Sequence, residues 1–215
     1  MIIDTFVLGD FETNCFCVRQ NEEAGDCLII DPGMGAEVLV QRLKEQNYTP
    51  VDILLTHGHA DHIGGVEALR QHWPKVRVTI HKDDADMLSN PTENLSLMAG
   101  VMVQARPAEV LLNSEDAYYE GAGLRFKVLH TPGHTPGHTS YLLDRDGGLL
   151  LVGDAAWSTK DNEVKRGYVN RSTPEVDASL RHLAEFEFEM AAFCHSKPIR
   201  TQASAAFRRF AESLK

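Results

Sequence analysis

The stretch Thr56-His57-Gly58-His59-Ala60-Asp61-His62-Ile63-Gly64-Gly65 places three imidazoles and one carboxylate within six residues. It directly follows the largely apolar run 51–55, so it is predicted to be a loop at the end of a strand, where several side chains can point at one centre. The two closing glycines are expected to let the chain turn tightly into the next helix. Imidazole and carboxylate ligands suit zinc, manganese and iron. The pattern H-x-H-x-D-H therefore favours a metal site over a loop of solvated histidines.

Three further candidate ligands each follow a short apolar segment. They are His134 after residues 124–129, Asp154 after residues 149–152 and His195 after residues 191–194. The first of these segments alternates apolar and basic side chains, which is typical of a half-buried strand. Because α/β proteins usually place their sites at strand ends, we expect these residues to converge with the first motif at one edge of a sheet.

Motifs in a fixed order give the chain a resemblance to a known family. They are Glu12-Thr13-Asn14-Cys15-Phe16, Leu28-Ile29-Ile30-Asp31-Pro32-Gly33, the H-x-H-x-D-H loop, residues 131–138, Gly153-Asp154 and His195. With them the chain resembles the metallo-β-lactamase-fold superfamily, and within it the glyoxalase II-like hydrolases, over nearly its whole length. The resemblance implies an α/β fold, a four-layer αβ/βα sandwich of two mixed β-sheets flanked by helices. We expect residues 1–215 to form a single hydrolase domain with two similar halves.

The same resemblance implies a centre with two divalent metal ions, zinc first and iron or manganese as alternatives. His57, His59 and His134 would hold one metal, Asp61, His62 and His195 would hold the second, and Asp154 would bridge them. The two ions would share a hydroxide as the nucleophile, and Asp61 would be the catalytic residue that orients it and takes its proton. Asp31 and His138 are candidates for supporting hydrogen bonds to the ligands, or else a turn-forming aspartate and a polar strand residue.

A glyoxalase II-like protein hydrolyses a thioester such as S-lactoylglutathione, so the resemblance implies a small thioester substrate. Two departures separate the chain from the full-length enzymes. Residues 155–215 are too few for the helical region that binds glutathione there, and Ser196-Lys197 stand where the family often has glycine. Lactone or ester hydrolysis is the alternative within the same chemistry. A mononuclear iron persulfide dioxygenase is the alternative from another class, although the complete second ligand set favours two metals.

Other members of the fold fit less well. True metallo-β-lactamases are usually exported and often have cysteine in the second metal site, where this chain offers Asp154. Flavodiiron-type oxygen reductases would have a carboxylate in place of His59 and would need a flavin domain. A nuclease would need a basic groove. We therefore expect none of these three activities.

Composition and charge narrow the partners and the compartment. A chain of 215 residues that is 43% hydrophobic can bury a core without disulfides. Its four cysteines form no C-x-x-C pair, and residues 1–5 do not resemble a secretory signal, so we expect free buried thiols in the cytoplasm. The formal net charge of −10 disfavours nucleic acid, and no segment is long and apolar enough to span a membrane. The sequence indicates a small-molecule substrate and no particular oligomeric state.

Two regions have open alternatives. Lys165, Arg166 and Arg171 form either a solvated loop or a rim that binds a carboxylate or phosphate of the substrate. Residues 83–115 mix apolar side chains with prolines. Most of these apolar residues are expected to fill the core, and the alternative is a lid beside the metals.

Apolar residues at helical spacing predict helices. The predicted buried faces are Ala36, Leu39, Val40 and Leu43; Val176, Leu180, Leu183 and Ala184; and Ala203, Phe207, Phe210 and Leu214. Thr173 and Pro174 are expected to be the N-cap and a first-turn residue of the second of these helices. Residues 66–73 predict a further helix and residues 76–80 a strand.

Overall fold

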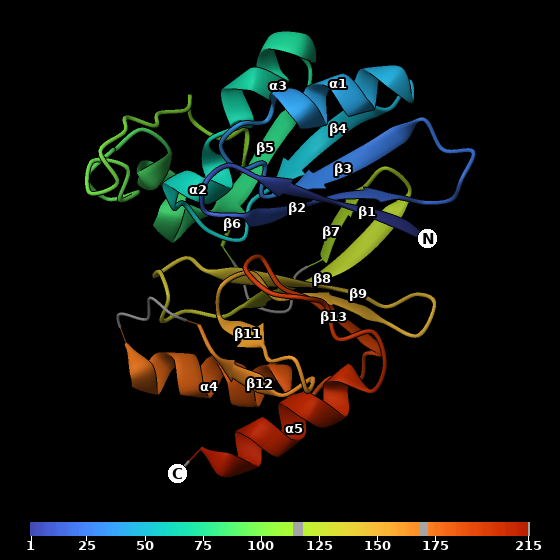
Figure 1. Ribbon diagram of the computed structural model, residues 1–215, viewed down its shortest axis with the longest axis vertical. Coiled ribbons are helices and arrows are strands. Elements are labelled where there is room, and N and C mark those ends of the chain that lie inside the picture. The colour runs from blue at the N-terminus through green and yellow to red at the C-terminus, as the bar shows by residue number, and fades with distance from the viewer. Residues whose placement is uncertain (114–117, 168–171, 215) are drawn as a thin grey trace. The chain divides into compact units, whose positions relative to one another are not determined.

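A computed structural model describes residues 1–113, 118–167 and 172–214. The chain divides into two compact units. The N-terminal unit comprises Met1–Asn113 and Glu120–Leu124, and the C-terminal unit comprises Ser114–Tyr119 and Arg125–Lys215. Each unit has a mixed β-sheet with helices packed beside it (Figure 1). The predicted α/β class, with mixed sheets flanked by helices, is confirmed, and the single domain over residues 1–215 stays a prediction.

Six strands form the N-terminal sheet in the order β1-β2-β3-β4-β5-β6. They are β1 (Ile2–Leu8), β2 (Thr13–Arg19), β3 (Asp26–Ile30), β4 (Thr49–Leu54), β5 (Arg77–His81) and β6 (Val110–Leu112). Strand β2 is antiparallel to both β1 and β3, whereas β3, β4, β5 and β6 are parallel to one another. The start of β2 and the ends of β3, β4 and β5 therefore share one edge of the sheet.

Helices α1 (Glu37–Glu45) and α3 (Val66–His72) cover one face of this sheet (Figure 1). The short helix α2 (Ala60–Ile63) and the 3₁₀ helix η1 (Lys82–Leu88) follow the ends of β4 and β5. The predicted stripe of Ala36, Leu39, Val40 and Leu43 is buried. It packs with the apolar residues of β3, β4 and β5 into the core of the unit.

Gly64 and Gly65 have a different role from the one predicted. Their φ angles of −60° and −94° are ordinary right-handed values, so the turn does not need glycine's conformational freedom. Space is the constraint instead. A Cβ atom on Gly65 would lie 2.5 Å from Ala36 Cβ and 2.8 Å from the Gly33 carbonyl oxygen. Glycine is required because the segment between β3 and α1 packs directly against the start of α3.

Five strands form the C-terminal sheet in the order β13-β10-β9-β8-β7. They are β7 (Tyr118–Gly121), β8 (Leu124–His130), β9 (Thr139–Leu143), β10 (Leu149–Leu151) and β13 (Met190–Ala192), and β11 (Ala156–Ser158) pairs separately with β12 (Val164–Arg166). Strand β9 is antiparallel to β8 and β10, and β13 is parallel to β10. Strands β8, β10 and β13 therefore end at the same edge of this sheet.

Helices α4 (Thr173–Leu183) and α5 (Ala203–Ser213) pack beside the C-terminal sheet. The predicted face of α4 is buried, and in α5 Ala203 and Phe207 are buried while Phe210 and Leu214 are half-buried. The predicted N-cap is wrong by one residue. Ser172 has the extended backbone of an N-cap and its carbonyl accepts from Val176 N–H, so Thr173 is already helical.

The segment 83–115 departs from its main prediction. Several apolar residues expected in the core are exposed, namely Leu97 (52%), Met98 (84%), Val101 (42%) and Met102 (71%), whereas Met87 and Leu88 are buried. The physical reason is that polar groups organise this segment. The fully buried side chain of Asn94 donates to the Met87 and Val103 carbonyls, and Ser96 Oγ donates to the Pro91 carbonyl. The segment therefore folds without burying its apolar tip.

Candidate metal centre

The candidate ligands follow strand ends, as predicted, but the strands belong to two sheets. His57 follows β4 of the N-terminal sheet. His134, Asp154 and His195 follow β8, β10 and β13, which end at one edge of the C-terminal sheet. The expectation of one shared sheet edge is therefore wrong, because the ligand-bearing strands are divided between the units. The structure shows two ligand groups, one in each unit.

Three buried histidines form the centre of the N-terminal group. His57 and His62 are fully buried and His59 is 5% exposed. His57 Nε2 lies 2.9 Å from His59 Nδ1, and the ring centroids of His57 and His62 are 4.0 Å apart. Buried imidazoles that turn ring nitrogens toward one another are expected of metal ligands, because solvated histidines would separate and face water.

Asp61 is the carboxylate of this group and remains partly accessible, with a side chain 19% exposed. Its Oδ2 accepts a hydrogen bond of 3.1 Å from the Thr13 hydroxyl and lies 3.3 Å from His62 Nε2. Thr13 begins β2, which places it at the sheet edge where β3 and β4 end. The motif around Thr13 was part of the family resemblance, but the sequence did not predict a role for Thr13 itself.

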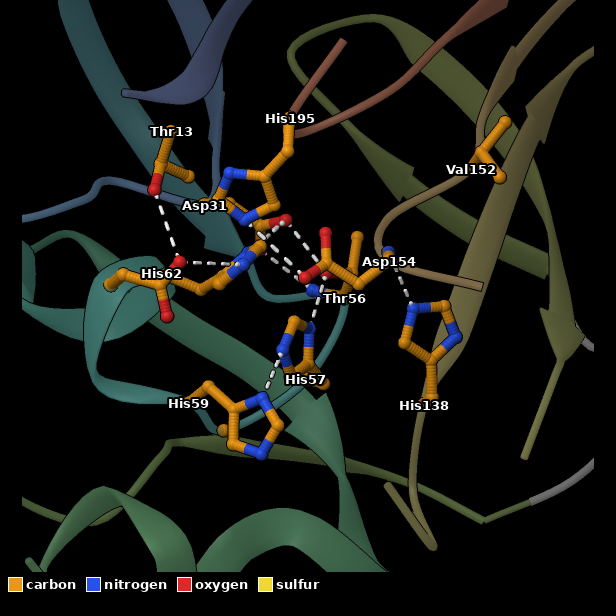
Figure 2. Close-up of polar contacts among 12 residues, drawn as sticks. Thr13, Asp31, Thr56, His57, His59, His62, His138, Val152, Asp154 and His195 are labelled. Carbon is orange, nitrogen blue, oxygen red and sulfur yellow. Dashed lines mark hydrogen bonds and ion pairs between the residues drawn. The ribbon is translucent and has the colours of Figure 1, made fainter. Parts of the chain in front are cut away.

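Asp31 links the ends of β3 and β4, as Figure 2 shows. Its Oδ1 accepts from the Thr56 backbone N–H at 2.8 Å, and its Oδ2 accepts from the Thr56 hydroxyl at 2.6 Å. The same Oδ2 lies 3.1 Å from His62 Nδ1, and Thr56 Oγ1 lies 3.1 Å from His57 Nδ1. Asp31 thus contacts His62 directly and reaches His57 through Thr56. Its role behind metal ligands stays a prediction.

Two further contacts hold the backbone of the motif. Gly58 N–H donates to Asp84 Oδ2 at 3.2 Å, and Ala60 N–H donates to the Asn94 carbonyl at 2.9 Å. Asp84 and Asn94 are fully buried. Sequence reasoning missed both, because an aspartate and an asparagine in a long connection resemble ordinary loop residues.

The C-terminal group centres on Asp154. Its Oδ2 lies 3.3 Å from His195 Nε2 and 3.6 Å from His134 Nε2, so one carboxylate oxygen faces two imidazoles. His134 is 2% exposed, and the His195 and Asp154 side chains are 24% and 14% exposed. This arrangement suits a carboxylate that binds a metal ion together with two histidines. Cys194, beside His195, is buried and forms no disulfide.

The side chain of His138 holds Asp154 by its backbone N–H. The Asp154 N–H donates to His138 Nε2 at 3.0 Å (Figure 2), and His138 Nδ1 lies 2.8 Å from Thr131 Oγ1. Thr131 Oγ1 contacts Ser140 Oγ at 3.1 Å, and Ser140 Oγ donates to the Val152 carbonyl. The ring of His138 is thus held from both nitrogens, and its supporting role at a metal site stays a prediction.

The two cations predicted as a substrate rim have carboxylate partners within their own unit. Lys165 Nζ lies 3.0 Å from Glu163 Oε2. Arg166 makes two hydrogen bonds to Asp177, and these bonds hold the pKa of that carboxyl below its usual range. Arg171 lies outside the described residues. The anion-binding rim stays a prediction. A substrate anion would have to compete with Glu163 and Asp177 for these two cations.

The residues of both groups fit the metal ions that the sequence predicts. The donors are imidazoles and carboxylates, their ring nitrogens and oxygens face one another, and most of them are buried. Asp31 and Thr56 occupy the outward nitrogens of His62 and His57, as partners of metal-ligating histidines do.

Comparison with known proteins identifies the family. The family model described as "Metallo-beta-lactamase superfamily" matches residues 8–195. The chain belongs to the metallo-β-lactamase superfamily. The crystal structure titled BLEG-1 B3 metallo-β-lactamase is 31% identical and superposes with a TM-score of 0.80 over 92% of this chain and 93% of that one. This likeness agrees with the α/β fold of mixed sheets flanked by helices.

Curated relatives in this superfamily have hydrolase names. The probable metallo-hydrolase YqgX of Bacillus subtilis is 34% identical over 68% of this chain and 67% of its own length. A hydroxyacylglutathione hydrolase of Xanthomonas campestris is 33% identical over 85% of this chain, which spans only 60% of the length of that relative. No helix in the described part of the chain has the length and apolarity to cross a membrane.

Proposed function

We propose that the chain is a binuclear metallohydrolase that cleaves a small thioester. His57, His59 and His134 would hold one metal, Asp61, His62 and His195 the other, and Asp154 both. The observation that supports the proposal most strongly is the donor set. In each unit imidazoles and a carboxylate are in mutual contact at a sheet edge, and every position of the predicted ligand pattern holds a histidine or an aspartate.

Two bound divalent ions would lower the pKa of water toward neutrality and polarise the carbonyl group under attack. We propose zinc first, because imidazole-rich ligand sets with carboxylates suit zinc well. Iron is the alternative, and a structure 25% identical to this chain is titled as the di-iron-bound form of TTHA1623.

Asp61 would hold the water and accept its proton. The Thr13 hydroxyl fixes the orientation of Oδ2, and the partial exposure of the side chain leaves it accessible to water. As the proton passes to Asp61, the water oxygen bonds to the carbonyl carbon of the thioester. The carbon–sulfur bond then breaks, and its electron pair leaves with the sulfur as a thiolate. Four buried cysteines that form no disulfide support the proposal of a reducing, cytoplasmic setting for such a reaction.

The substrate class is tested with the purified, metal-quantified protein. S-lactoylglutathione, a lactone, a β-lactam, a phosphodiester and glutathione persulfide are supplied in turn. We expect thioester hydrolysis that a chelator abolishes and that zinc or iron restores. Hydrolysis of the lactone alone would replace the thioester by the ester alternative, whereas oxygen uptake on the persulfide with a single iron would replace hydrolysis altogether.

Asp61→Ala tests the proposed catalytic residue. We expect loss of metal from one site and a fall in turnover, because the same carboxylate binds metal and takes the proton. Asp86→Ala is the matched control, since Asp86 is an exposed carboxylate of the same unit outside the ligand group. Full metal content with undiminished hydrolysis in Asp61→Ala would refute the assignment.

A further inference from the structure

Two threonine hydroxyls lie at strand ends and touch histidine rings without being candidate ligands. Thr56 follows β4 in the N-terminal unit, and Thr131 follows β8 in the C-terminal unit. Thr56 is 1% exposed and Thr131 is fully buried. A hydroxyl has one proton to donate, so in a buried site the direction of each hydrogen bond follows from what its partners can accept.

The chain of hydrogen bonds that begins at Val152 has one possible direction. A carbonyl oxygen only accepts, so the Ser140 hydroxyl gives its proton to the Val152 carbonyl at 3.0 Å. Ser140 Oγ then accepts from Thr131 Oγ1 at 3.1 Å. With its proton committed to Ser140, Thr131 Oγ1 accepts at 2.8 Å from the Nδ1 of His138, which must carry the hydrogen.

The other end of this chain of hydrogen bonds independently gives the same tautomer of His138. The Asp154 N–H can only donate, and it donates to His138 Nε2 at 3.0 Å, so that nitrogen carries a lone pair. Both ends therefore require the neutral tautomer of His138 with its hydrogen on Nδ1. The chain starts at the carbonyl of Val152 and ends at the N–H of Asp154, the two neighbours of Gly153, whose φ is +63°. It closes around the turn that presents the Asp154 carboxylate.

In the N-terminal unit, the hydrogen bonds of Thr56 fix the tautomer of His57 in the same way. The Thr56 hydroxyl donates its one proton to Asp31 Oδ2 at 2.6 Å. Its oxygen then accepts from the Nδ1 of His57 at 3.1 Å. The hydrogen of His57 is thereby fixed on Nδ1, and its Nε2, which faces His59, presents a lone pair.

We infer that Thr56 and Thr131 are positioning residues that fix the tautomers of His57 and His138. Thr56 keeps the lone pair of His57 Nε2 directed at the metal, and Thr131 keeps His138 as the acceptor that holds the Asp154 turn. The tautomers rest on the hydrogen bonds alone. Only their effect on metal binding rests on the proposed function.

Nitrogen-15 NMR of the histidine rings tests the tautomers directly, in the zinc-loaded protein and after chelator treatment. Long-range proton–nitrogen spectra distinguish a ring protonated on Nδ1 from one protonated on Nε2. We expect the Nδ1–H pattern for His138 in both samples and for His57 after zinc removal. Thr131→Val should give mixed tautomer signals for His138, whereas Thr131→Ser, which keeps the hydroxyl, should restore the wild-type pattern.

Zinc affinity is the second readout, measured by competition with a chelator. Thr131→Val should weaken zinc binding by about 10–100-fold, the usual effect of losing a support behind a metal ligand, and Thr131→Ser should recover most of it. Thr139→Val is the matched control. Thr139 is also fully buried, but its hydroxyl donates to the Gly137 carbonyl, which does not belong to the chain of hydrogen bonds around His138. It should leave the tautomer of His138 unchanged.

The outcomes separate the inference from the proposed function. An Nε2–H or averaged pattern for His138 in the wild-type protein would overturn the inference, even if Thr131→Val failed to fold. An unchanged His138 pattern in a folded Thr131→Val variant would do the same. The predicted tautomers in a protein that binds neither zinc nor iron would leave the inference standing and refute the metal centre.

Discussion

The carboxylate of Asp31 accepts two hydrogen bonds from Thr56, one from the backbone N–H at 2.8 Å and one from the hydroxyl at 2.6 Å. Asp31 has a φ of +50°, a left-handed conformation that aspartate and asparagine tolerate better than most residues. The pair joins the ends of the parallel strands β3 and β4. The same carboxylate also contacts His62, so it connects the strand ends to two histidines of the N-terminal group.

Replacing Asp31 by asparagine should weaken metal binding while preserving the fold. Asparagine accepts the left-handed conformation, but its amide can donate to Thr56 Oγ1 and release the hydroxyl proton toward His57. We expect metal affinity to fall by about 10–100-fold, as for other lost supports behind metal ligands. Isothermal titration of zinc into the chelated protein measures the change. Wild-type affinity in a folded Asp31→Asn protein would contradict the account.

Gly65→Ala should destabilise the protein through a steric conflict rather than a conformational one. The new methyl group would lie 2.5 Å from Ala36 Cβ and 2.8 Å from the Gly33 carbonyl oxygen. Overpacking of this kind typically costs about 1–3 kcal/mol. Gly25→Ala is the matched control, since its Cβ would meet only the Asn47 carbonyl oxygen at 3.9 Å. Equal unfolding free energies of the two variants in urea would show that the segment before α1 can yield.

Glu109 should contribute stability that depends on pH. Burial alone would raise its pKa, but hydrogen bonds from Arg70 and the Val78 N–H, with the charge of Arg70, outweigh burial and place the pKa below the ordinary value of 4.5. A folded pKa below the unfolded one gives stability that is present above the unfolded value and is lost as pH falls through the folded value.

The stability difference between wild type and Glu109→Gln should therefore be largest near pH 7 and shrink as the pH falls below about 4.5. Urea unfolding at a series of pH values measures it. A difference that stays constant down to about pH 3 would show that the Glu109 charge does not contribute to folding.

Arg166→Ala should affect stability more than substrate binding. The guanidinium pairs with Asp177 but is 39% exposed, so we expect a loss of only about 0.5–1 kcal/mol. KM for an anionic thioester should stay unchanged in this variant and in Lys165→Ala, whose ammonium pairs with Glu163. A several-fold rise in KM for either variant would instead support the anion-binding rim.

Sequence patterns predicted the ligand strands well because periodicity and motif spacing are local properties. The β4 and β8 strands, the stripe of α1 and the positions of His57, His134, Asp154 and His195 past strand ends follow from neighbouring residues alone. The predicted loop over the whole first motif is wrong, because Asp61 and His62 lie in the short helix α2. The division of those strands between two sheets does not follow from neighbouring residues. It depends on pairings such as β10 with β13, which join segments about forty residues apart in the sequence.

The contacts that sequence reasoning missed are those between ordinary polar residues. Thr13, Asp84 and Asn94 each make a hydrogen bond to the motif 57–62, and their types and spacing do not distinguish them from other turn residues. Gly65 was recognised for the wrong reason, because a missing side chain can satisfy either a backbone angle or a close contact. Only the packing around the residue separates the two.

The binuclear centre can be located by anomalous diffraction from crystals of the metal-loaded protein, recorded at the absorption edge of the bound metal. We expect two metal peaks about 3.5–4 Å apart. His57, His59 and His134 should surround one peak, Asp61, His62 and His195 the other, and Asp154 should contact both. A single peak, or metal bound away from these seven residues, would contradict the binuclear centre.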